Sequence, residues 1–352
     1  MVYLSKITNA TVSHLINITM NRRALIKLVG VSSLALALPR SLSLFAQQTN
    51  PMEAKEFEVI IIGGSYAGLS TAMTLGRSLR KTLIIDAGKP CNQQTPHSHN
   101  FLTQDGSTPK EIAQIAKKQV AQYESISFYD GLATSGKKSD KGFEITTSKG
   151  AIFTAKKLVF AAGVKDLMPD IKGFSECWGI SVVHCPYCHG YEIRNQKTAI
   201  IANGERAIHL ATLVHNLTKE ITIITLGKKN FEEKELQKLK EHRIQIIEKE
   251  ISAIEHQNGQ LEKIVFKDGS SENFDCAYAA IPFEQNSKIP QELGCKITEN
   301  GHIEVNFMQK TTEEGIFACG DNSTMMRSVS MAVSGGTITG AMINHELSQE
   351  NF

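Results

Sequence analysis

The residues best suited to chemistry are two cysteines separated by two residues, Cys185 and Cys188, followed directly by His189. Thiols at this spacing can close a small disulfide ring without large backbone movement. The intervening Pro186 suits the first turn of a helix, where its missing N–H needs no partner. A helix N-terminus and a nearby cation both favour thiolate over thiol. The motif therefore predicts thiol–disulfide redox chemistry, with Cys185, Cys188 and His189 as the catalytic candidates.

The same residues fit two other kinds of site. CxxCH is the attachment motif of c-type haem, and a CxxC pair can be half of a zinc site. Haem needs an open pocket and a second ligand, whereas this segment lies between two nucleotide-binding patterns. A closed zinc site normally takes four ligands, and the sequence has no second Cys/His pair nearby. We therefore expect no metal. The remaining cysteines are scattered and are predicted to be small buried hydrophobic residues: Cys91, Cys177, Cys276, Cys295 and Cys319.

Length and charge limit the possible functions. The chain has 352 residues, which favours two domains with a sizeable core. A formal net charge of +2 gives no strong field for nucleic acid or an anionic membrane. We expect neither as a partner.

A first dinucleotide-binding pattern begins near residue 57. The run 57–62 is predicted to be a strand, 63–68 a tight turn, 69–79 a helix and 82–85 a second strand. Glycines and small residues let the turn approach a pyrophosphate, the helix N-terminus attracts the phosphates, and an acidic residue after the second strand can accept hydrogen bonds from a ribose. The cofactor-binding candidates here are Gly63, Gly64, Ser65, Ala67, Gly68 and Asp86.

Two later segments complete this pattern. Residues 158–163 read as a strand and glycine turn that return the chain to the nucleotide, which adds Ala162 and Gly163 as candidates. Residues 315–321 read as a strand ending in Gly320-Asp321, before a helix at about 326–345. The order of the three segments is typical of flavoproteins with two dinucleotide folds.

A second βαβ unit departs from the usual pattern. It comprises a strand at 197–201, a turn at 202–207, a helix at 208–217 and a strand at 221–226. Its possible NAD(P)-binding residues are Asn203, Gly204, Ala207, Lys228 and Lys229. Lysines bind phosphate as point charges and lack the bidentate fork of arginine, so NADPH use is uncertain. The dipeptides Asn258-Gly259 and Asp268-Gly269 predict hairpin turns, and 276–281 is the predicted closing strand.

Together these motifs resemble the low-molecular-weight thioredoxin reductase family, and within it the branch of the gliotoxin and holomycin dithiol oxidases. The resemblance runs from about residue 56 to the C-terminus, through 63–69, 96–101, 185–192, 194–197 and Gly320-Asp321. It implies FAD as cofactor, Asn100 as a flavin contact, Cys188 nearer the isoalloxazine and Cys185 as the exchanging thiol. His189 stands where thioredoxin reductases place an acidic proton donor, and could shuttle a proton at neutral pH. It also implies a thioredoxin-like protein or a small dithiol or disulfide as partner, and a homodimer.

The predicted fold class is α/β, with two Rossmann-like dinucleotide-binding domains, the second inserted in the first. We expect an FAD-binding domain formed by 51–165 and 285–352, and an NAD(P)-binding-like domain with the CxxC at 166–284. The predicted function is FAD-dependent thiol–disulfide oxidoreduction, with oxidation of dithiols by oxygen possible. The alternatives are an NADPH-dependent thioredoxin-disulfide reductase and a non-catalytic flavin-binding redox sensor.

Residues 1–50 are interpreted as an export signal and linker. Paired arginines, Arg22 and Arg23, precede an apolar run at 28–38 that is too short for a membrane span. This layout resembles a twin-arginine signal, with Met20 as a candidate start, and predicts an exported, periplasmic protein. A clean A-x-A cleavage site is missing, so a leader on a cytoplasmic enzyme is the alternative.

Overall fold

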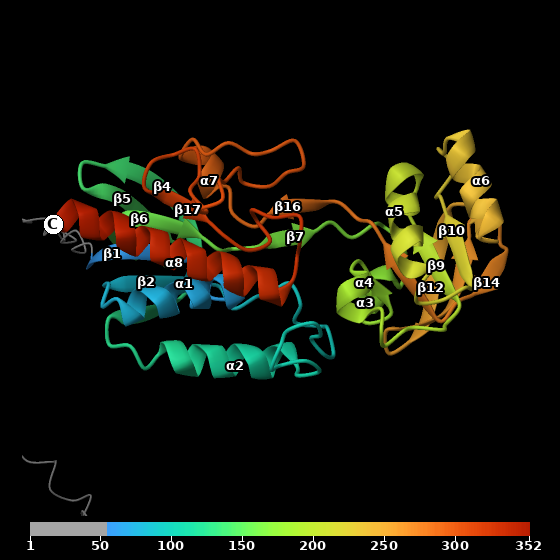
Figure 1. Ribbon diagram of the computed structural model, residues 1–352, viewed down its shortest axis with the longest axis horizontal. Helices are drawn as coiled ribbons and strands as arrows, with labels where there is room; N and C mark the ends of the chain where they lie inside the picture. Colours follow the sequence, from blue (N-terminus) through green and yellow to red (C-terminus); the bar gives the residue numbers. More distant parts are fainter. Residues whose placement is uncertain (1–54) are drawn as a thin grey trace, which may run out of the picture. The chain divides into compact units, whose positions relative to one another are not determined.

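The computed structural model describes residues 55–352 (Figure 1). The predicted export signal and linker lie outside the described residues. Between residues 55 and 352, no helix is long and apolar enough to cross a membrane.

A seven-stranded sheet is formed by segments from both ends of the described chain. Its strands are β1 (Lys55–Ile62), β2 (Thr82–Asp86), β3 (Ile126–Asp130), β4 (Ala133–Ser139), β5 (Gly142–Thr147), β6 (Ile152–Phe160) and β17 (Ile316–Ala318). The order is β3-β2-β1-β6-β5-β4, and β17 pairs with β6 in parallel. The helices α1 (Tyr66–Arg77), α2 (Pro109–Val120), α7 (Ile289–Glu292) and α8 (Val329–Asn351) belong to the same part of the chain. Because helices and loops cover both faces, β1 is a continuous buried apolar run from Val59 to Ile62.

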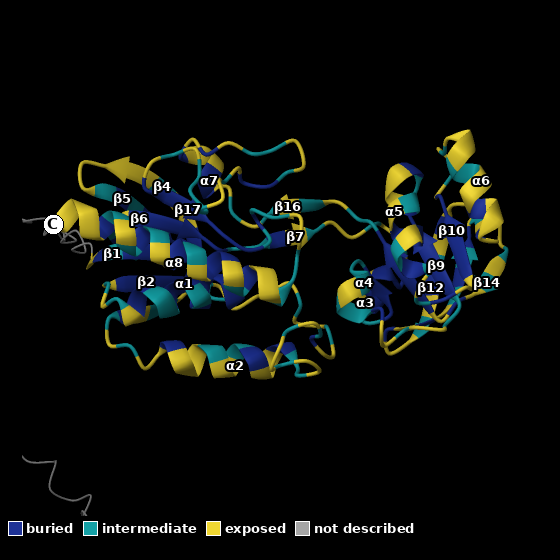
Figure 2. Cartoon of the chain, in the orientation of Figure 1, coloured by how far each residue is buried: buried dark blue, intermediate teal, exposed yellow. Residues whose placement is uncertain are grey.

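A five-stranded parallel sheet lies between these segments in the sequence, with the order β11-β10-β9-β15-β8. Its strands are β8 (Val182–Val183), β9 (Thr198–Ile201), β10 (Ile221–Ile224), β11 (Gln245–Ile247) and β15 (Cys276–Ala279), with helices α5 (Gly204–Val214) and α6 (Glu233–Glu241). Figure 2 shows β9 and β10 in the buried colour, whereas the edge strand β11 has no buried residue and α6 is exposed over most of its surface.

Smaller elements connect and cover the two sheets. Strands β12 (Ile251–Gln257), β13 (Gln260–Phe266) and β14 (Ser271–Asn273) form an antiparallel meander, with the predicted turns at Asn258-Gly259 and Asp268-Gly269. Strands β7 (Val164–Asp166) and β16 (Phe283–Gln285) pair as a two-stranded ribbon where the chain leaves and re-enters the first sheet. The short helices α3 (Phe174–Cys177) and α4 (Pro186–His189) precede β9.

The predicted fold class, two Rossmann-like units with the second inserted in the first, is confirmed. The exact domain boundaries remain a prediction. The element ends differ by a few residues: α1 begins at Tyr66 and α5 at Gly204, several residues before the predicted starts, because the glycine turns pass directly into the first helical turn. Helix α8 begins later than predicted, because the Ser328 side chain accepts a hydrogen bond from the Met331 N–H and caps it there.

Close contact between α1 and α8 holds the first unit together, as these helices pack side by side (Figure 1). A Cβ added to Gly336 would lie 2.2 Å from the carbonyl oxygen of Ala67. That oxygen belongs to the backbone of α1 and cannot turn aside. A Cβ on the preceding residue, Gly335, would meet its nearest neighbour, the Cβ of Cys319, at an ordinary 3.5 Å.

We therefore expect Gly336→Ala to lower the free energy of unfolding by about 1–3 kcal/mol, because the two helices must separate. Gly335→Ala is the matched control. It should leave stability unchanged or raise it by up to about 1 kcal/mol, because alanine is the better helix former. Urea unfolding of both variants and the parent measures the difference, and equal effects at the two positions would contradict this account of the packing.

Candidate functional site

A cavity of about 610 Å³ lies against the first glycine turn, and this volume is typical of small-molecule sites. Nine of the predicted cofactor-binding residues line it: Gly63, Gly64, Ser65, Ala67, Asp86, Ala162, Gly163, Gly320 and Asp321. The structure thus brings together three segments that are far apart in the sequence.

The N-terminus of α1 faces this cavity with its backbone donors free. Ser65 occupies the N-cap position, but its side chain makes no capping hydrogen bond, so the first N–H groups of the helix are available to an anion. Gly68 does not line the cavity, and its role is close packing: a Cβ there would lie 1.9 Å from the carbonyl oxygen of Gly63. These features fit a dinucleotide pyrophosphate.

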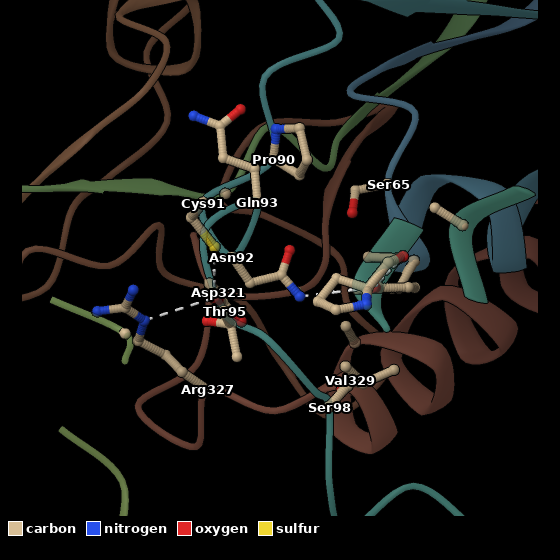
Figure 3. A pocket seen from close by; sticks show the side chains of 18 of the residues that line it. Ser65, Pro90, Cys91, Asn92, Gln93, Thr95, Ser98, Asp321, Arg327 and Val329 are labelled. Carbon is tan, nitrogen blue, oxygen red and sulfur yellow. Dashed lines mark hydrogen bonds and ion pairs between the residues drawn. The ribbon is translucent and has the colours of Figure 1, made fainter. Parts of the chain in front are cut away.

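Carboxylates mark two further positions on the wall. Asp86 accepts a hydrogen bond from the Gly64 N–H at 3.1 Å, which fixes the carboxylate beside the turn. Asp321 lies between Cys91 and Arg327, whose side chains both point toward it (Figure 3). Burial raises the pKa of Asp321, and the charge of Arg327 opposes that shift.

The predicted redox pair forms a disulfide between Cys185 and Cys188, with a Cα–Cα distance of 5.3 Å. Cys188 and His189 line the cavity described above, whereas Cys185 does not. Cys185 is the N-cap of α4, a single turn too short to contribute much dipole. Two sulfurs bonded to each other are not ligands of a metal, and within residues 55–352 no cluster of His, Cys, Asp or Glu is arranged to hold one.

His189 is half-buried beside the disulfide; its two ring nitrogens are themselves buried, and neither has a hydrogen-bond partner among the described residues. Burial lowers the pKa of this imidazole, an effect that the nearby Glu192 opposes. The ring is therefore neutral at pH 7 in the disulfide state, and it can accept a proton. The resemblance implied that His189 donates a proton at neutral pH. To do so, the neutral imidazole must first receive that proton.

Asp166 connects the cavity wall to the segment that leads to the cysteines. Its carboxylate accepts hydrogen bonds from both terminal nitrogens of Arg327, at 2.8 and 3.2 Å, and from Trp178 Nε1 at 3.2 Å. Trp178 also stacks on Phe174 and His184. None of these four residues, Asp166, Arg327, Trp178 and His184, belongs to a motif, and no spacing in the sequence indicates that they meet.

The chain matches the protein-family model described as pyridine nucleotide-disulphide oxidoreductase over residues 57–336. The chain belongs to this family. It is 30% identical over 312 residues to the thioredoxin reductase tcpT of Claviceps purpurea (strain 20.1), covering 82% of this chain and 94% of the relative. It is 30% identical to the thioredoxin reductase aclD of Aspergillus oryzae (strain ATCC 42149 / RIB 40), covering 84% and 98%.

Solved structures agree with this family assignment. A putative thioredoxin reductase TrxB from Bacillus anthracis has a TM-score of 0.80 and 28% identity, over 84% of this chain and all of its own. An oxidoreductase from Agrobacterium tumefaciens has a TM-score of 0.78 and 36% identity, over 83% of this chain and 98% of its own. The resemblance to thioredoxin reductases predicted from the sequence is confirmed. Like the rest of the pyridine nucleotide-disulphide oxidoreductase family, the protein is an FAD-binding oxidoreductase, and the uncapped α1 turn with its surrounding cavity fits that cofactor.

Asn100 is the one predicted flavin contact that lies in a different setting. It does not line the cavity, although its neighbours Ser98 and His99 do. Its backbone N–H donates to Asp105 Oδ1 at 2.7 Å and its carbonyl accepts from Ser330 Oγ at 2.8 Å. Asn100 has φ 59°, so it shapes this turn rather than facing the cofactor cavity.

The predicted nucleotide-binding residues of the second unit of this oxidoreductase do not line the cavity. Its predicted residues Asn203, Gly204 and Ala207 lie at the start of α5, where Ala207 is buried in the core behind the turn. Lys228 and Lys229 follow β10, and Lys229 Nζ pairs with Glu248 at 2.6 Å. In the sequence, the CxxC directly precedes the second nucleotide unit. In the structure, Cys188 lines the cavity that lies against the glycine turn of the first unit.

We expect Arg327→Met to lower the free energy of unfolding by about 3 kcal/mol, because it leaves the carboxylates of Asp166 and Asp321 buried without their cation. Arg327→Lys should recover only part of this loss, because an ammonium lacks the bidentate fork. Denaturant unfolding of the FAD-loaded protein measures both.

The control is Arg77→Met, which removes an exposed arginine from α1 and should change stability by less than about 0.5 kcal/mol. An equal loss from Arg77→Met and Arg327→Met would mean that the Asp166 pairing contributes nothing specific.

Proposed function

We propose that the protein is a dithiol oxidase: it takes two electrons from a small dithiol through Cys185 and Cys188, and dioxygen, rather than NADP, closes its cycle. The observation that carries this proposal is the difference between its two nucleotide turns. One is open to a phosphate and the other is filled by its own side chain.

The phosphate turn of the second unit is occupied by Asn203. Its Oδ1 accepts the N–H groups of Gly204 and Asn230, both at 2.9 Å, and its Nδ2 donates to the Lys228 carbonyl at 2.9 Å. In a Rossmann unit, N–H groups at the start of this helix bind the pyrophosphate. Here an uncharged amide already accepts the first of these N–H groups, that of Gly204, so a nucleotide would have to displace the amide from this position. The corresponding Ser65 of the first unit makes no such bond.

The surroundings of this turn add to the argument. The cation best placed for a phosphate, Lys229, is paired with Glu248 through both its Nζ and its backbone N–H. A hollow of about 320 Å³ next to the ends of β9 and β10 is lined by apolar residues and by none of the predicted NAD(P) contacts. These features favour an electron donor other than NADPH.

The residues of the chain support the thiol steps as follows. A substrate thiol attacks Cys185, the cysteine of the pair that does not line the cavity. The Cys185–Cys188 bond breaks, Cys188 leaves as a thiolate, and the neutral imidazole of His189 takes the substrate proton. The second substrate thiol then displaces Cys185 as a thiolate, loses its proton to solvent and forms the substrate disulfide. Bound FAD supplies the two-electron acceptor that restores the pair, with dioxygen as final oxidant and hydrogen peroxide as its product.

An NADPH-dependent thioredoxin-disulfide reductase is the second candidate. It is favoured by the names of the relatives, which are called thioredoxin reductases, and its partner would be a thioredoxin-like protein. The third candidate, a redox sensor without turnover, shares the fold and the disulfide. We further propose that the twin-arginine-like segment directs export to the periplasm, a compartment in which NADPH is not supplied. We also propose that the protein assembles as a homodimer.

Anaerobic mixing distinguishes these candidates. We expect that NADPH leaves the flavin absorption of the FAD-loaded protein unchanged, because Asn203 blocks the second nucleotide turn, and that dithiothreitol bleaches it. Readmitted air should restore the absorption with one hydrogen peroxide formed per dithiol. Rapid bleaching by NADPH would remove the oxidase proposal.

Cys188→Ser and Asn203→Gly are the informative variants for the same experiment. Cys188→Ser should keep the bound flavin yet lose bleaching by dithiothreitol, because no thiolate remains on the cavity wall. Unchanged bleaching and turnover in this variant would contradict both catalytic candidates, the dithiol oxidase and the NADPH-dependent reductase. Asn203→Gly frees the Gly204 N–H at the start of α5, so any weak NADPH binding should increase in this variant.

The pH profile tests the role of His189. Because burial places its pKa below 6.5, the neutral, proton-accepting form dominates at pH 7 and is lost only as the pH falls through that lowered value. We expect the acid limb of kcat/KM for the dithiol to lie below pH 6.5, with Glu192 and His99 as the neighbouring charges that set its position. His189→Phe should lower kcat/KM about 100-fold and abolish the limb. A limb that persists in His189→Phe belongs to another group.

A further inference from the structure

The loop between β2 and α2 contacts the chain on both sides of the disulfide. Before the cysteines, Gln94 Nε2 donates a hydrogen bond to the Trp178 carbonyl at 2.5 Å. After them, His99 Nε2 lies 3.6 Å from Glu192 Oε1. Gln94, His99 and Cys188 all line the cofactor cavity. These two contacts therefore connect one wall of the cavity to the segment that carries the cysteine pair.

The backbone around His99 has a defined shape. The Ser98 N–H donates a hydrogen bond to the Ser107 carbonyl at 2.8 Å, and the Gly106 N–H donates to the Ser98 carbonyl at 2.9 Å. His99 follows Ser98 directly, and its side chain is only 20% exposed. The imidazole is thus presented from a loop that is closed by its own hydrogen bonds.

The ring of His99 lies between two carboxylates. Its Nδ1 is 3.6 Å from Asp105 Oδ1, and its Nε2 is 3.6 Å from Glu192 Oε1. Asp105 is held within the loop by the Asn100 N–H, at 2.7 Å, whereas Glu192 belongs to the turns that follow α4. A neutral imidazole has one N–H, and an imidazolium has two together with a positive charge. Only the protonated ring therefore attracts both carboxylates at once.

This pair of side chains lies close to the histidine of the CxxCH motif. Burial is the main cause that lowers the pKa of His189; the Glu192 carboxylate opposes this shift and the charge of His99 adds to it. Both groups are therefore near enough to act on the imidazole beside the disulfide. A change in their contact would be felt at the redox pair.

We propose that His99 is a positioning residue for the cysteine pair: its imidazolium binds the Glu192 carboxylate and so holds Cys188 at the cavity wall while the pair is re-oxidised. This rests on the proposed function only in that electrons pass between the pair and FAD, a step that the oxidase and the reductase share. The two side chains are 20% and 40% exposed, so their contact changes the population of the closed arrangement by up to about fivefold. It is also weakened by salt.

Anaerobic stopped-flow reduction of the FAD-loaded protein by dithiothreitol tests the proposal. The limiting rate of flavin bleaching at saturating dithiothreitol reports transfer from the pair, whereas the half-saturating concentration reports the encounter with the dithiol. Work at about pH 6 keeps an ordinary histidine protonated. The variants are His99→Gln, Glu192→Gln, the two combined, and His99→Lys, which keeps a cation without the imidazole.

We expect His99→Gln and Glu192→Gln each to lower the limiting rate about fivefold and to leave the half-saturating concentration unchanged. The combined variant should be no slower than the slower single variant, because both substitutions remove the same contact. His99→Lys should recover most of the rate. Raising the ionic strength from about 0.01 to about 1 M shortens the Debye length from about 30 to about 3 Å. It should therefore slow the parent and His99→Lys, but not His99→Gln.

His209→Gln and Glu262→Gln are the matched controls. Both side chains are exposed, and neither residue lines the cavity. Both variants should be reduced at the parent rate and with the salt dependence of the parent. If His99→Gln does not fold, Glu192→Gln and His99→Lys carry the same comparison.

Three results would overturn the proposal. One is a limiting rate equal to that of the parent in both His99→Gln and Glu192→Gln. Another is a combined variant whose loss is the product of the two single losses, because the side chains would then act independently. The third is a raised FAD dissociation constant in His99→Gln alone, which would make His99 a cofactor contact.

The outcome for the proposed function is separate. Flavin that is bleached by NADPH as well as by dithiothreitol would remove the oxidase proposal and leave every comparison among these variants valid. A parent protein whose flavin dithiothreitol does not bleach would contradict both proposals, because the pair would then pass no electrons to FAD.

Discussion

The carboxylate of Asp166 is the constraint on which the site depends. Its side chain is only 9% exposed and that of Arg327 15%, so each charge is stable there only because the other is present with good geometry. Asp166 ends β7, in the ribbon through which the chain leaves the first sheet, and the indole of Trp178 hydrogen-bonds the same carboxylate. One ion pair thus fixes three pieces: the loop before α8, the connecting ribbon and the segment that leads to the disulfide.

Two copies of one supersecondary unit have different chemistry in this chain because of the side chain at the helix N-cap. Ser65 is short and makes no capping bond, so the first turn of α1 keeps its donors for a ligand. The side chain of Asn203 accepts the first N–H of α5, that of Gly204, together with the N–H of Asn230 from the loop after β10. A side chain that caps the first turn stabilises a helix, and a helix whose first turn is left uncapped lacks that stabilisation. The first unit therefore gives up local stability for binding, and the second keeps its fold without that function.

The sequence predicted the features that depend on local spacing. Glycine turns, buried strands and the CxxC pair follow from residues close together in the chain, and the turns at Asn258-Gly259 and Asp268-Gly269 were found for the same reason. Contacts such as Arg327 with Asp166 join residues 161 positions apart, and no motif marks them. The capping role of Asn203 was missed as well: the amide was taken as a possible ligand contact, and only the geometry shows that its oxygen accepts backbone donors.

The cavity that favours the neutral form of the imidazoles also favours the protonated form of a third thiol on its wall. Cys91 lines the same cavity as Cys188. The prediction that Cys91 is buried is wrong, because the residue is exposed. Desolvation of its thiol and the neighbouring Asp321 carboxylate nevertheless raise its pKa to about 11, so the thiol stays protonated at neutral pH and is a poor nucleophile. Desolvation disfavours the charged form of each side chain, so it raises the pKa of a cysteine and lowers the pKa of a histidine. Desolvation that favours the neutral, proton-accepting form of His189 therefore also favours the thiol form of Cys91 over its thiolate.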